Sequence, residues 1–494
     1  MHRTMDYLTL AVVLLAASSL SLPLLQLSKR WSRVLPGYML AVVLLAVVAL
    51  VSLAVVSPAQ STSFGNLLSD DQLGGVFALV TVGITLAVTV ASLETRKGTN
   101  SSVYYSLLSF TALGMLLLSY AQDLLMIFVA WELMSLPTYV LAGVDKKLRS
   151  NEAAVKYAVI GAMSSAIILY AISLAYGLTG STQISSVVQG FYEILTTQGH
   201  PSALASVAIL LFVAGFGFKM SIVPFHMWIP DAYEGAPTTV STLLAAATKK
   251  AGFIAAIRVL LAITTLYVVT QNPLFTMANV FAVLALVTMT VGNISALTQK
   301  SMTRLLAYSS IAQAGYILIG FVAYSASPGS TAASIGMTGA ILHVVNHAIM
   351  TGAAFLVAAL VIMQLKRADI GAFDGLARKM PITSFTMAVS MLALAGIPPL
   401  SGFWSKLLLI LSVANGQFGW LAVAAVLNSA LSLGYYGWIV KRMYFDEGEA
   451  TGRIAEPAWF VLIFAVLVGL IIGIGIFPQQ AINFASGAVT NIPA

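Results

Sequence analysis

Cysteine is absent from the 494-residue sequence, and histidine occurs only five times. Without cysteine the chain forms no disulfide and offers no thiolate to zinc, to an iron–sulfur cluster or to haem. We therefore expect no metal site and no redox centre in this chain. Any redox chemistry linked to it depends on cofactors that another polypeptide holds.

Charged residues are also scarce, at 8% of the chain, whereas soluble globular proteins carry about 25%. Hydrophobic residues make up 59%, and the mean hydropathy is +0.94. This composition argues against a soluble protein and predicts an all-α polytopic membrane protein. The formal charge of +7 would suit an anionic partner, but its distribution along the chain favours membrane topology over nucleic-acid binding.

Apolar segments predict fourteen membrane spans, each near the roughly 20 residues that a bilayer requires. The first is interpreted as a retained helix, because the residues before it are too weakly charged for a signal peptide. The predicted spans are 6–28, 37–57, 73–94, 103–120, 122–143, 153–177, 203–223, 238–262, 277–298, 303–325, 333–363, 381–412, 418–440 and 458–478.

The positions of lysine and arginine test this count. The loops that follow odd-numbered spans hold most of the 24 Lys and Arg residues, whereas the loops after even-numbered spans hold none. By the positive-inside rule, the odd-numbered loops are cytoplasmic and both termini lie outside. We expect a multi-pass protein of a prokaryotic-type plasma membrane, in contact with lipid.

Prolines interrupt two of the predicted spans. Pro224 lies at the end of the seventh span, and Pro398 and Pro399 lie within the twelfth. Proline removes a backbone donor and breaks or kinks a helix. Interruptions at corresponding positions are typical of internal repeats in transporters, so we expect two inverted five-helix repeats, spans 4–8 and 9–13. The expected divisions of the chain are 1–102, 103–270, 271–445 and 446–494.

A few charged residues lie inside the predicted spans. An unpaired charge in the middle of a membrane costs about 2.5 kcal/mol or more, so such residues are usually functional. We interpret the acid and three of the lysines as a line of titratable groups that carries protons. The alternative is a set of buried salt bridges that only fixes helix packing. The candidates are Glu132, Lys219, Lys249 and Lys406, with Lys250 about 100° around the helix from Lys249.

Two further groups of residues are secondary relay candidates. His343 and His347 are spaced i, i+4 on one helix face, which suits a proton relay, a hydrogen-bonded packing pair or, by spacing alone, a metal pair. No acidic third ligand is near them in sequence. The other group follows the break at Pro224, where His226, Asp231 and Glu234 form either a turn segment or a proton uptake point.

Lys156 stands near the start of the sixth predicted span, four residues after Glu152. This spacing is ordinary for an i, i+4 ion pair at a helix start. A relay role for Lys156 is the alternative interpretation.

These residues lie in segments that resemble the antiporter-like membrane subunits of respiratory complex I and its relatives. The same likeness extends to multisubunit cation/proton antiporters and membrane-bound hydrogenases. The segments are WELMSLPTYVLAG, SNEAAVKYAVIGA, YGLTGSTQIS, GFKMSIVPFHMWIPDAYEGAPTTVS, TKKAGFIAAIRVL and LALAGIPPLSGFWSKL.

The resemblance implies that Glu132, Lys219, Lys249 and Lys406 form the proton pathway. The family pattern K-x-A-x-F matches residues 249–253, which selects Lys249 over Lys250. Lysine at position 406 and the short segment after the last span resemble the N-type subunit. One departure is Thr351, which stands where many relatives carry a lysine in H-A-x-x-K.

The function implied is that of a proton-translocating membrane-arm subunit of a complex I-like oxidoreductase. The resemblance places flavin, iron–sulfur clusters and a quinone-like carrier in partner subunits, next to further antiporter-like subunits. The electron donor could be NADH, a reduced deazaflavin or ferredoxin. The alternative is a subunit of a multisubunit Na⁺/H⁺ antiporter or of a membrane-bound hydrogenase.

Overall fold

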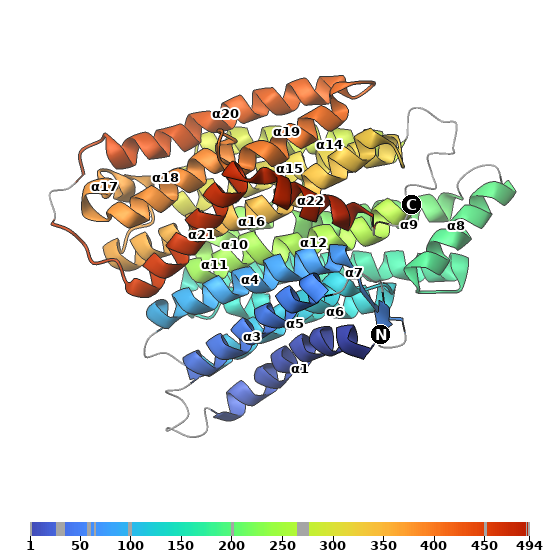
Figure 1. Ribbon diagram of the computed structural model, residues 1–494, viewed down its shortest axis with the longest axis horizontal. Coiled ribbons are helices and arrows are strands. Elements are labelled where there is room, and N and C mark those ends of the chain that lie inside the picture. The colour runs from blue at the N-terminus through green and yellow to red at the C-terminus, as the bar shows by residue number, and fades with distance from the viewer. Residues whose placement is uncertain are drawn as a thin grey trace.

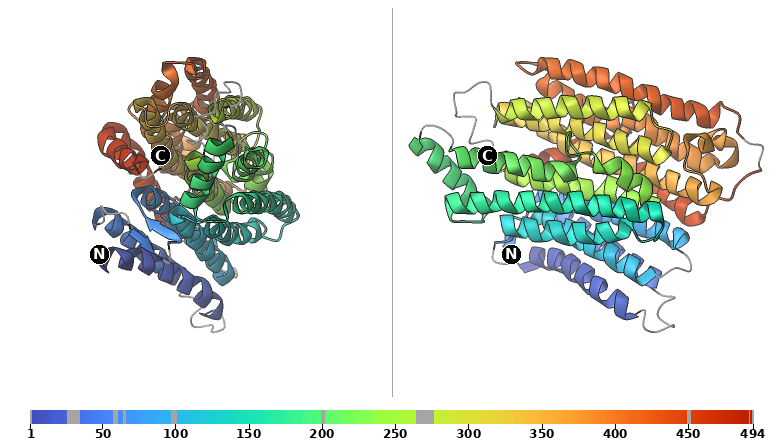
Figure 2. Two further views of the ribbon diagram at one scale, coloured as in Figure 1. Left: turned by 90° about the vertical axis from the view of Figure 1, so that its right-hand side faces the viewer. Right: turned by 180° about the vertical axis from the view of Figure 1, so that it is seen from behind.

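The structure is a computed structural model that describes residues 2–25, 35–56, 61–63, 66–96, 101–198, 202–263, 276–448, 452–490 and 492. Helices make up nearly all of this chain, and most run side by side along one common direction (Figure 1). The chain progresses across the bundle, so that its first helices lie at one edge and residues 419–444 lie at the opposite edge (Figures 1 and 2).

Within the described residues, eleven helices are long and apolar enough to cross a membrane. They are α1 His2–Leu25, α4 Gln72–Thr95, α5 Ser101–Tyr120, α6 Leu124–Ala142, α7 Leu148–Thr179, α9 Ala203–Met220, α14 Met277–Leu297, α15 Met302–Ala326, α16 Thr331–Leu365, α20 Gly419–Tyr444 and α21 Ala458–Ile476. The predicted spans at these places begin and end within a few residues of the observed helices.

The remaining elements are shorter or less regular. They are α3 Leu35–Val56, β1 Ser61–Ser63, β2 Leu68–Asp70, α8 Ile184–Gln198, α10 Trp228–Gly235, α11 Thr238–Leu243, η1 Leu244–Thr248, α12 Lys249–Ala256, η2 Ile257–Leu261, η3 Ile370–Phe373, α17 Leu376–Lys379, α18 Pro381–Ala395, α19 Ser401–Ala414 and α22 Pro478–Val489. The strands β1 and β2 pair as an antiparallel hairpin between α3 and α4. The all-α prediction did not include this hairpin.

The helix of the seventh predicted span ends before its proline. Ser221, with a φ of 68°, closes α9, and a turn that contains Pro224 leads to α10. The indole of Trp228 donates to the carbonyl oxygen of Phe218 at 3.0 Å. The same carbonyl also accepts from the backbone N–H of Ser221, so the indole is a second donor at the end of α9.

The helix of the twelfth predicted span is broken as well. Gly396, with a φ of 89°, ends α18, and Pro398 and Pro399 lie in the link before α19. A left-handed residue at this position is the usual conformation for a helix end, and glycine adopts it without steric cost.

The eighth predicted span differs from the single helix that we expected. Residues 238–261 form α11, the π-helical segment η1, α12 and a second π-helical segment, η2. The wider turns shift the side chains that follow them around the helix axis, and such segments occur frequently at functional sites. The apolar pattern of the sequence contained no signal for them.

The link between α18 and α19 packs tightly against α21. Trp404 donates from its indole nitrogen to the carbonyl oxygen of Gly475 at 2.8 Å. A Cβ added at Gly475 would lie only 1.9 Å from the carbonyl oxygen of Pro399. The close approach therefore requires glycine at position 475.

A buried ion pair joins α4, α5 and η2. The guanidinium of Arg258 donates to both carboxylate oxygens of Asp71, at 3.0 and 2.9 Å, and to the carbonyl oxygen of Ser119. Both charged side chains are 2% exposed. Asp71 also accepts from the backbone of Gly74 and so caps α4. Because the pair is bidentate and buried, removing either partner alone would leave an uncompensated charge.

We predict that Gly475→Ala destabilises the protein, because the new methyl group collides with the Pro399 carbonyl. Overpacking of this kind costs about 1–3 kcal/mol, so the thermal midpoint in lipid nanodiscs should fall. Gly473→Ala is the matched control, since the same helix leaves open space there. Equal midpoints for the two variants would contradict the packing account.

Asp70, next to Asp71 in β2, gives a prediction on pH. Burial, and then the charge of Asp71, raise the pKa of Asp70 from 3.8 to about 6. The folded protein thus binds this proton more tightly than the unfolded chain does. The stability that the protonated carboxyl group contributes is therefore lost as the pH rises from about 4 through about 6. In the Asp70→Asn variant, the thermal midpoint should fall less over this pH range than it does in the wild type. An unchanged pH profile would show that Asp70 does not titrate there.

Candidate functional site

The first part of the candidate site lies between α6, α7 and α9. The amine of fully buried Lys219 donates to the hydroxyl oxygens of Ser135, at 3.2 Å, and Tyr157, at 2.8 Å. Glu132 is half-buried and accepts a short hydrogen bond from Ser165. Ser135 and Glu132 lie one helical turn apart on α6. The hydrogen bonds of the amine therefore go to hydroxyls, one of them a helical turn from the Glu132 carboxylate.

Aromatic rings surround the Lys219 amine. It lies 5.2 Å from the ring centre of Tyr157 and 6.0 Å from that of Tyr139. Tyr157 in turn stacks on Trp228 at 4.5 Å, just beyond the break in the chain. An amine close to aromatic faces gains a cation–π attraction in its charged form. The break after α9 thus helps to form the environment of Lys219.

The second part contains the adjacent lysines of α12, which are both fully buried. Lys249 donates to the carbonyl oxygen of Ser310 on α15 at 2.6 Å and to its hydroxyl at 3.1 Å. Lys250 contacts Nδ1 of His347 on α16 at short range and donates to the carbonyl oxygen of Ala245 at 3.3 Å. The two amines therefore point to different neighbouring helices, and both lie within the bundle.

Gly252 brings this second part close to the first. A Cβ added there would lie 3.0 Å from Cβ of Lys219 and 3.2 Å from its backbone carbon. The lack of a side chain at position 252 lets α12 pack directly against α9 at Lys219.

The third part runs from α16 to the second helix break. The rings of His343 and His347 are nearly parallel, with centres 6.2 Å apart. His343 pairs with Ser405 through Nδ1, at 2.9 Å, and with Gln313 through Nε2, at 3.0 Å. Both nitrogens of His343 have protein partners, so the two histidines do not share a metal-binding geometry. No group of three potential metal ligands occurs within the described ranges.

Lys406 lies at the end of this third part. Its amine donates to the carbonyl oxygens of Leu394, at 2.8 Å, and Ala395, at 3.1 Å, and to the hydroxyl of Ser429. These carbonyls belong to the last turn of α18, where a helix carries partial negative charge. The side-chain amide of Gln313 donates to the same Leu394 oxygen. His343, Gln313 and Lys406 are therefore joined through shared polar contacts.

Lys156, Asp231 and Glu234, three of the remaining candidates, form an ion-pair cluster at the end of the bundle whose loops carry the lysines and arginines. Lys156 pairs with Glu152 at 2.8 Å and with Asp231 at 3.0 Å. Arg304 pairs with Asp231 at 2.7 Å and with Glu234 at 3.2 Å. These contacts connect α7, α10 and α15.

The cluster also affects the titration of Asp231. Partial burial raises the pKa of its carboxyl group, but hydrogen bonds from Arg304 and Lys156 outweigh this and hold the pKa below its usual value. Asp231 is therefore ionised at neutral pH. His226 does not contact this cluster within the described chain, and its Nδ1 is buried without a hydrogen-bond partner there.

Sequence reasoning missed most partners of the buried amines. Ser135, Tyr157 and Ser310 are polar residues in apolar helices, and nothing in their spacing distinguishes them from other serines and tyrosines. Gln313 offered a better signal, since an amide in the middle of an apolar helix usually has a buried partner.

The comparisons with known proteins identify the family of this chain. The family model of the NADH:quinone oxidoreductase/Mrp antiporter, TM, matches residues 121–432. The F(420)H(2) dehydrogenase subunit N of Methanosarcina mazei is 41% identical over 441 residues, which cover 87% of this chain and 86% of the relative. The NADH-quinone oxidoreductase subunit N of Desulfitobacterium hafniense is 37% identical over 438 residues, which cover 85% of this chain and 86% of the relative.

A solved structure supports the same assignment. A chain of respiratory complex I from Thermus thermophilus aligns with a TM-score of 0.78 and 31% identity, and the alignment covers 97% of this chain and 100% of that one. The resemblance inferred from the sequence segments is thus confirmed. The chain belongs to the NADH:quinone oxidoreductase/Mrp antiporter transmembrane family.

Proposed function

We propose that this chain is a proton-translocating membrane-arm subunit of a complex I-like oxidoreductase, closest to the N-type. The observation that carries the proposal is the set of partners of the buried amines. Lys219, Lys249 and Lys406 donate to hydroxyls and backbone carbonyls. In a buried salt bridge, loss of the proton from the amine would leave a charged carboxylate without its partner. These amines contact neutral acceptors, so they can release a proton without that cost.

The fourteen-span topology is part of the proposal. Besides the eleven long apolar helices, it counts α3, the interrupted segment α11–η2 and the broken pair α18–α19 as one span each. The two breaks then fall on the fourth helix of each five-helix unit, spans 4–8 and 9–13, which supports an inverted repeat. The distribution of Lys and Arg supports cytoplasmic odd-numbered loops and both termini outside.

The proposed proton line follows the contacts of the site. It begins at Glu132 and Lys219, continues through Lys249, and reaches Lys406 in the second unit. Lys250, His347 and His343 are candidate stations between the two units, because their contacts span the distance from α12 to Gln313. Energy released by electron transfer elsewhere would shift Glu132 relative to Lys219 and so change the field at the amine.

The residues near the cytoplasmic end have a different proposed role. Asp231, Glu234 and Lys156 lie in an ion-pair cluster that fixes α10 beside the broken helix. His226, which has no partner for Nδ1 in the described residues, is the better candidate for a proton uptake point.

The partners are proposed from the names of the relatives. An F(420)H(2) dehydrogenase and an NADH-quinone oxidoreductase are redox enzymes, and the chain itself has no cysteine. We therefore place flavin, iron–sulfur clusters and a quinone-like carrier in other subunits, next to further antiporter-like subunits.

The second candidate function is a subunit of a multisubunit Na⁺/H⁺ antiporter, because the family also includes the Mrp antiporter. The two functions require different partners. Affinity purification of the native complex should recover flavin and iron–sulfur proteins with this chain. Recovery of small hydrophobic subunits alone would favour the antiporter.

Lys219→Ala and Glu132→Gln should each lower donor-driven proton pumping by about tenfold or more, because each removes a proton-carrying group. Pumping is measured in proteoliposomes of the purified complex, with NADH or F420H2 as the electron donor. Lys300→Ala, at an exposed lysine, is the control and should pump normally. Normal pumping in the first two variants, with the complex assembled, would rule out the proposed proton line.

Lys406→Arg separates proton transfer from helix capping. Arginine keeps the positive charge at the end of α18 but does not release its proton in proteins. We expect the variant to retain the thermal midpoint of the wild type and to lose pumping. If Lys406→Arg pumps normally, the amine is only a structural cap.

A further inference from the structure

A cleft next to the ion-pair cluster, with Glu234 in its lining, opens at the Lys- and Arg-rich end of the bundle. Its volume is about 490 Å³, and its lining comes from the end of α4, the start of α7, the α10–α11 turn and the end of α16. Thr95 and Thr239 are among its lining residues. The proposed proton line does not use this cleft.

Hydroxyl groups lie at the inner wall of the cleft. The hydroxyl of Thr239 lies 3.3 Å from that of Tyr104, which lies 2.9 Å from that of Ser92. The Thr95 hydroxyl is buried and has no hydrogen-bond partner among the described residues. These groups offer several donors and acceptors to water in the cleft.

A row of buried hydroxyls continues from this wall along α4. Thr89, Thr85 and Thr81 follow Ser92 at one-turn intervals, and each donates to a carbonyl oxygen one turn earlier. Their lone pairs remain able to accept hydrogen bonds. The helix α4 packs against α11, η1 and α16.

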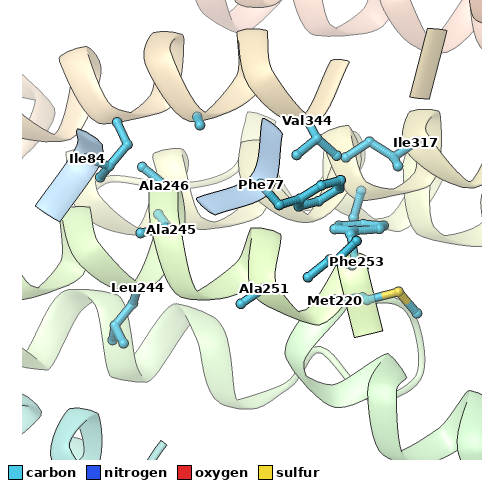
Figure 3. Packing of buried hydrophobic residues seen from close by; sticks show 14 of the residues in the cluster. Phe77, Ile84, Met220, Leu244, Ala245, Ala246, Ala251, Phe253, Ile317 and Val344 are labelled. Atoms are coloured by element: carbon cyan, nitrogen blue, oxygen red, sulfur yellow. The ribbon is translucent and has the colours of Figure 1, made fainter. Parts of the chain in front are cut away.

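An apolar contact lies beside this row of hydroxyls, at the residue before Thr85. Ile84 of α4 lies beside Ala246 of η1 (Figure 3). A Cβ added at Gly352 of α16 would lie 3.2 Å from Cδ1 of Ile84 and 3.5 Å from Cβ of Ala246. The three helices therefore meet at Ile84, with two very small residues facing it.

The Lys250–His347 pair lies just beyond this contact. Lys250 follows Ala246 by about one turn of its helix, and His347 precedes Gly352 by about one and a half turns of α16. Nδ1 of His347 contacts the Lys250 amine, while its Nε2 is buried without a partner within the described ranges. The Thr351 hydroxyl, one turn from His347, is also buried and unpartnered there.

We infer that this cleft is the cytoplasmic mouth of a separate proton route, which ends on the Lys250–His347 pair and is closed by Ile84. Movement of Ile84 away from Ala246 and Gly352 admits water, since an apolar constriction gates by excluding water. A hydrated proton then binds Nε2 of His347, and the proton on Nδ1 passes to the neutral amine of Lys250, so that no other reactant is consumed. This inference rests on the proposed function.

The lack of cysteine in the chain makes a direct test possible. A single cysteine is introduced as Thr239→Cys in the whole complex, and inside-out vesicles are treated with a charged, membrane-impermeant methanethiosulfonate. We expect labelling to lower donor-driven pumping to about half or less, because the adduct fills the mouth of the route. Glu447→Cys, which lines a different cleft of about 240 Å³, is the control and should pump normally after labelling.

A second cysteine tests the closure. Ala246→Cys should resist the reagent in the wild-type background and react when combined with Ile84→Ala. Complete labelling at position 239 with unchanged pumping would overturn the route, and protection of position 246 in both backgrounds would overturn the role of Ile84. If Thr239→Cys does not assemble, Thr95→Cys replaces it at the same cleft.

The Lys219→Ala variant separates this inference from the proposed function. Loss of pumping in Lys219→Ala, together with insensitivity to the label at position 239, would overturn the route alone. Normal pumping in Lys219→Ala would overturn the proposed function and the route with it.

Discussion

Backbone carbonyls accept from most of the buried cations of this site, and Lys219 is the exception. Lys406, Lys249 and Arg258 each donate to at least one main-chain oxygen, and only Arg258 also has a carboxylate partner. A carbonyl cannot take a proton at any physiological pH, so it stabilises a charged amine without competing for its proton. The bundle can thus hold several cations in an apolar interior and still allow each lysine to change its protonation state.

The helix interruptions supply part of this environment. At the break after α18, two carbonyls of the last turn accept from Lys406, whereas at the break after α9 an indole donates to a carbonyl of the last turn and the amine of Lys219 donates to hydroxyls. The two breaks therefore hold their lysines in different ways. The irregular helix between them, with η1 and η2 on either side of α12, directs Lys249 and Lys250 to different neighbours.

Much of the architecture could be predicted because it follows from local rules. The length of the apolar segments predicted the long helices, and Pro224, Pro398 and Pro399 indicated both breaks. The site was only partly predictable, since a buried amine finds its partners on helices distant in sequence. Ser310 and the carbonyl of Leu394 carry no pattern that connects them to a lysine, and a π-helical turn leaves the apolar pattern unchanged. The pairing of Arg258 with Asp71 was missed for the same reason.

That pairing also constrains how the chain can change over time. Asp71 opens α4, among the first helices of the chain, whereas Arg258 lies 187 residues later in η2. A chain that lost its N-terminal helices would keep a guanidinium group in an apolar interior with no anion beside it. The two residues should therefore be inherited together, and a lineage that replaces one by a neutral residue should replace the other as well.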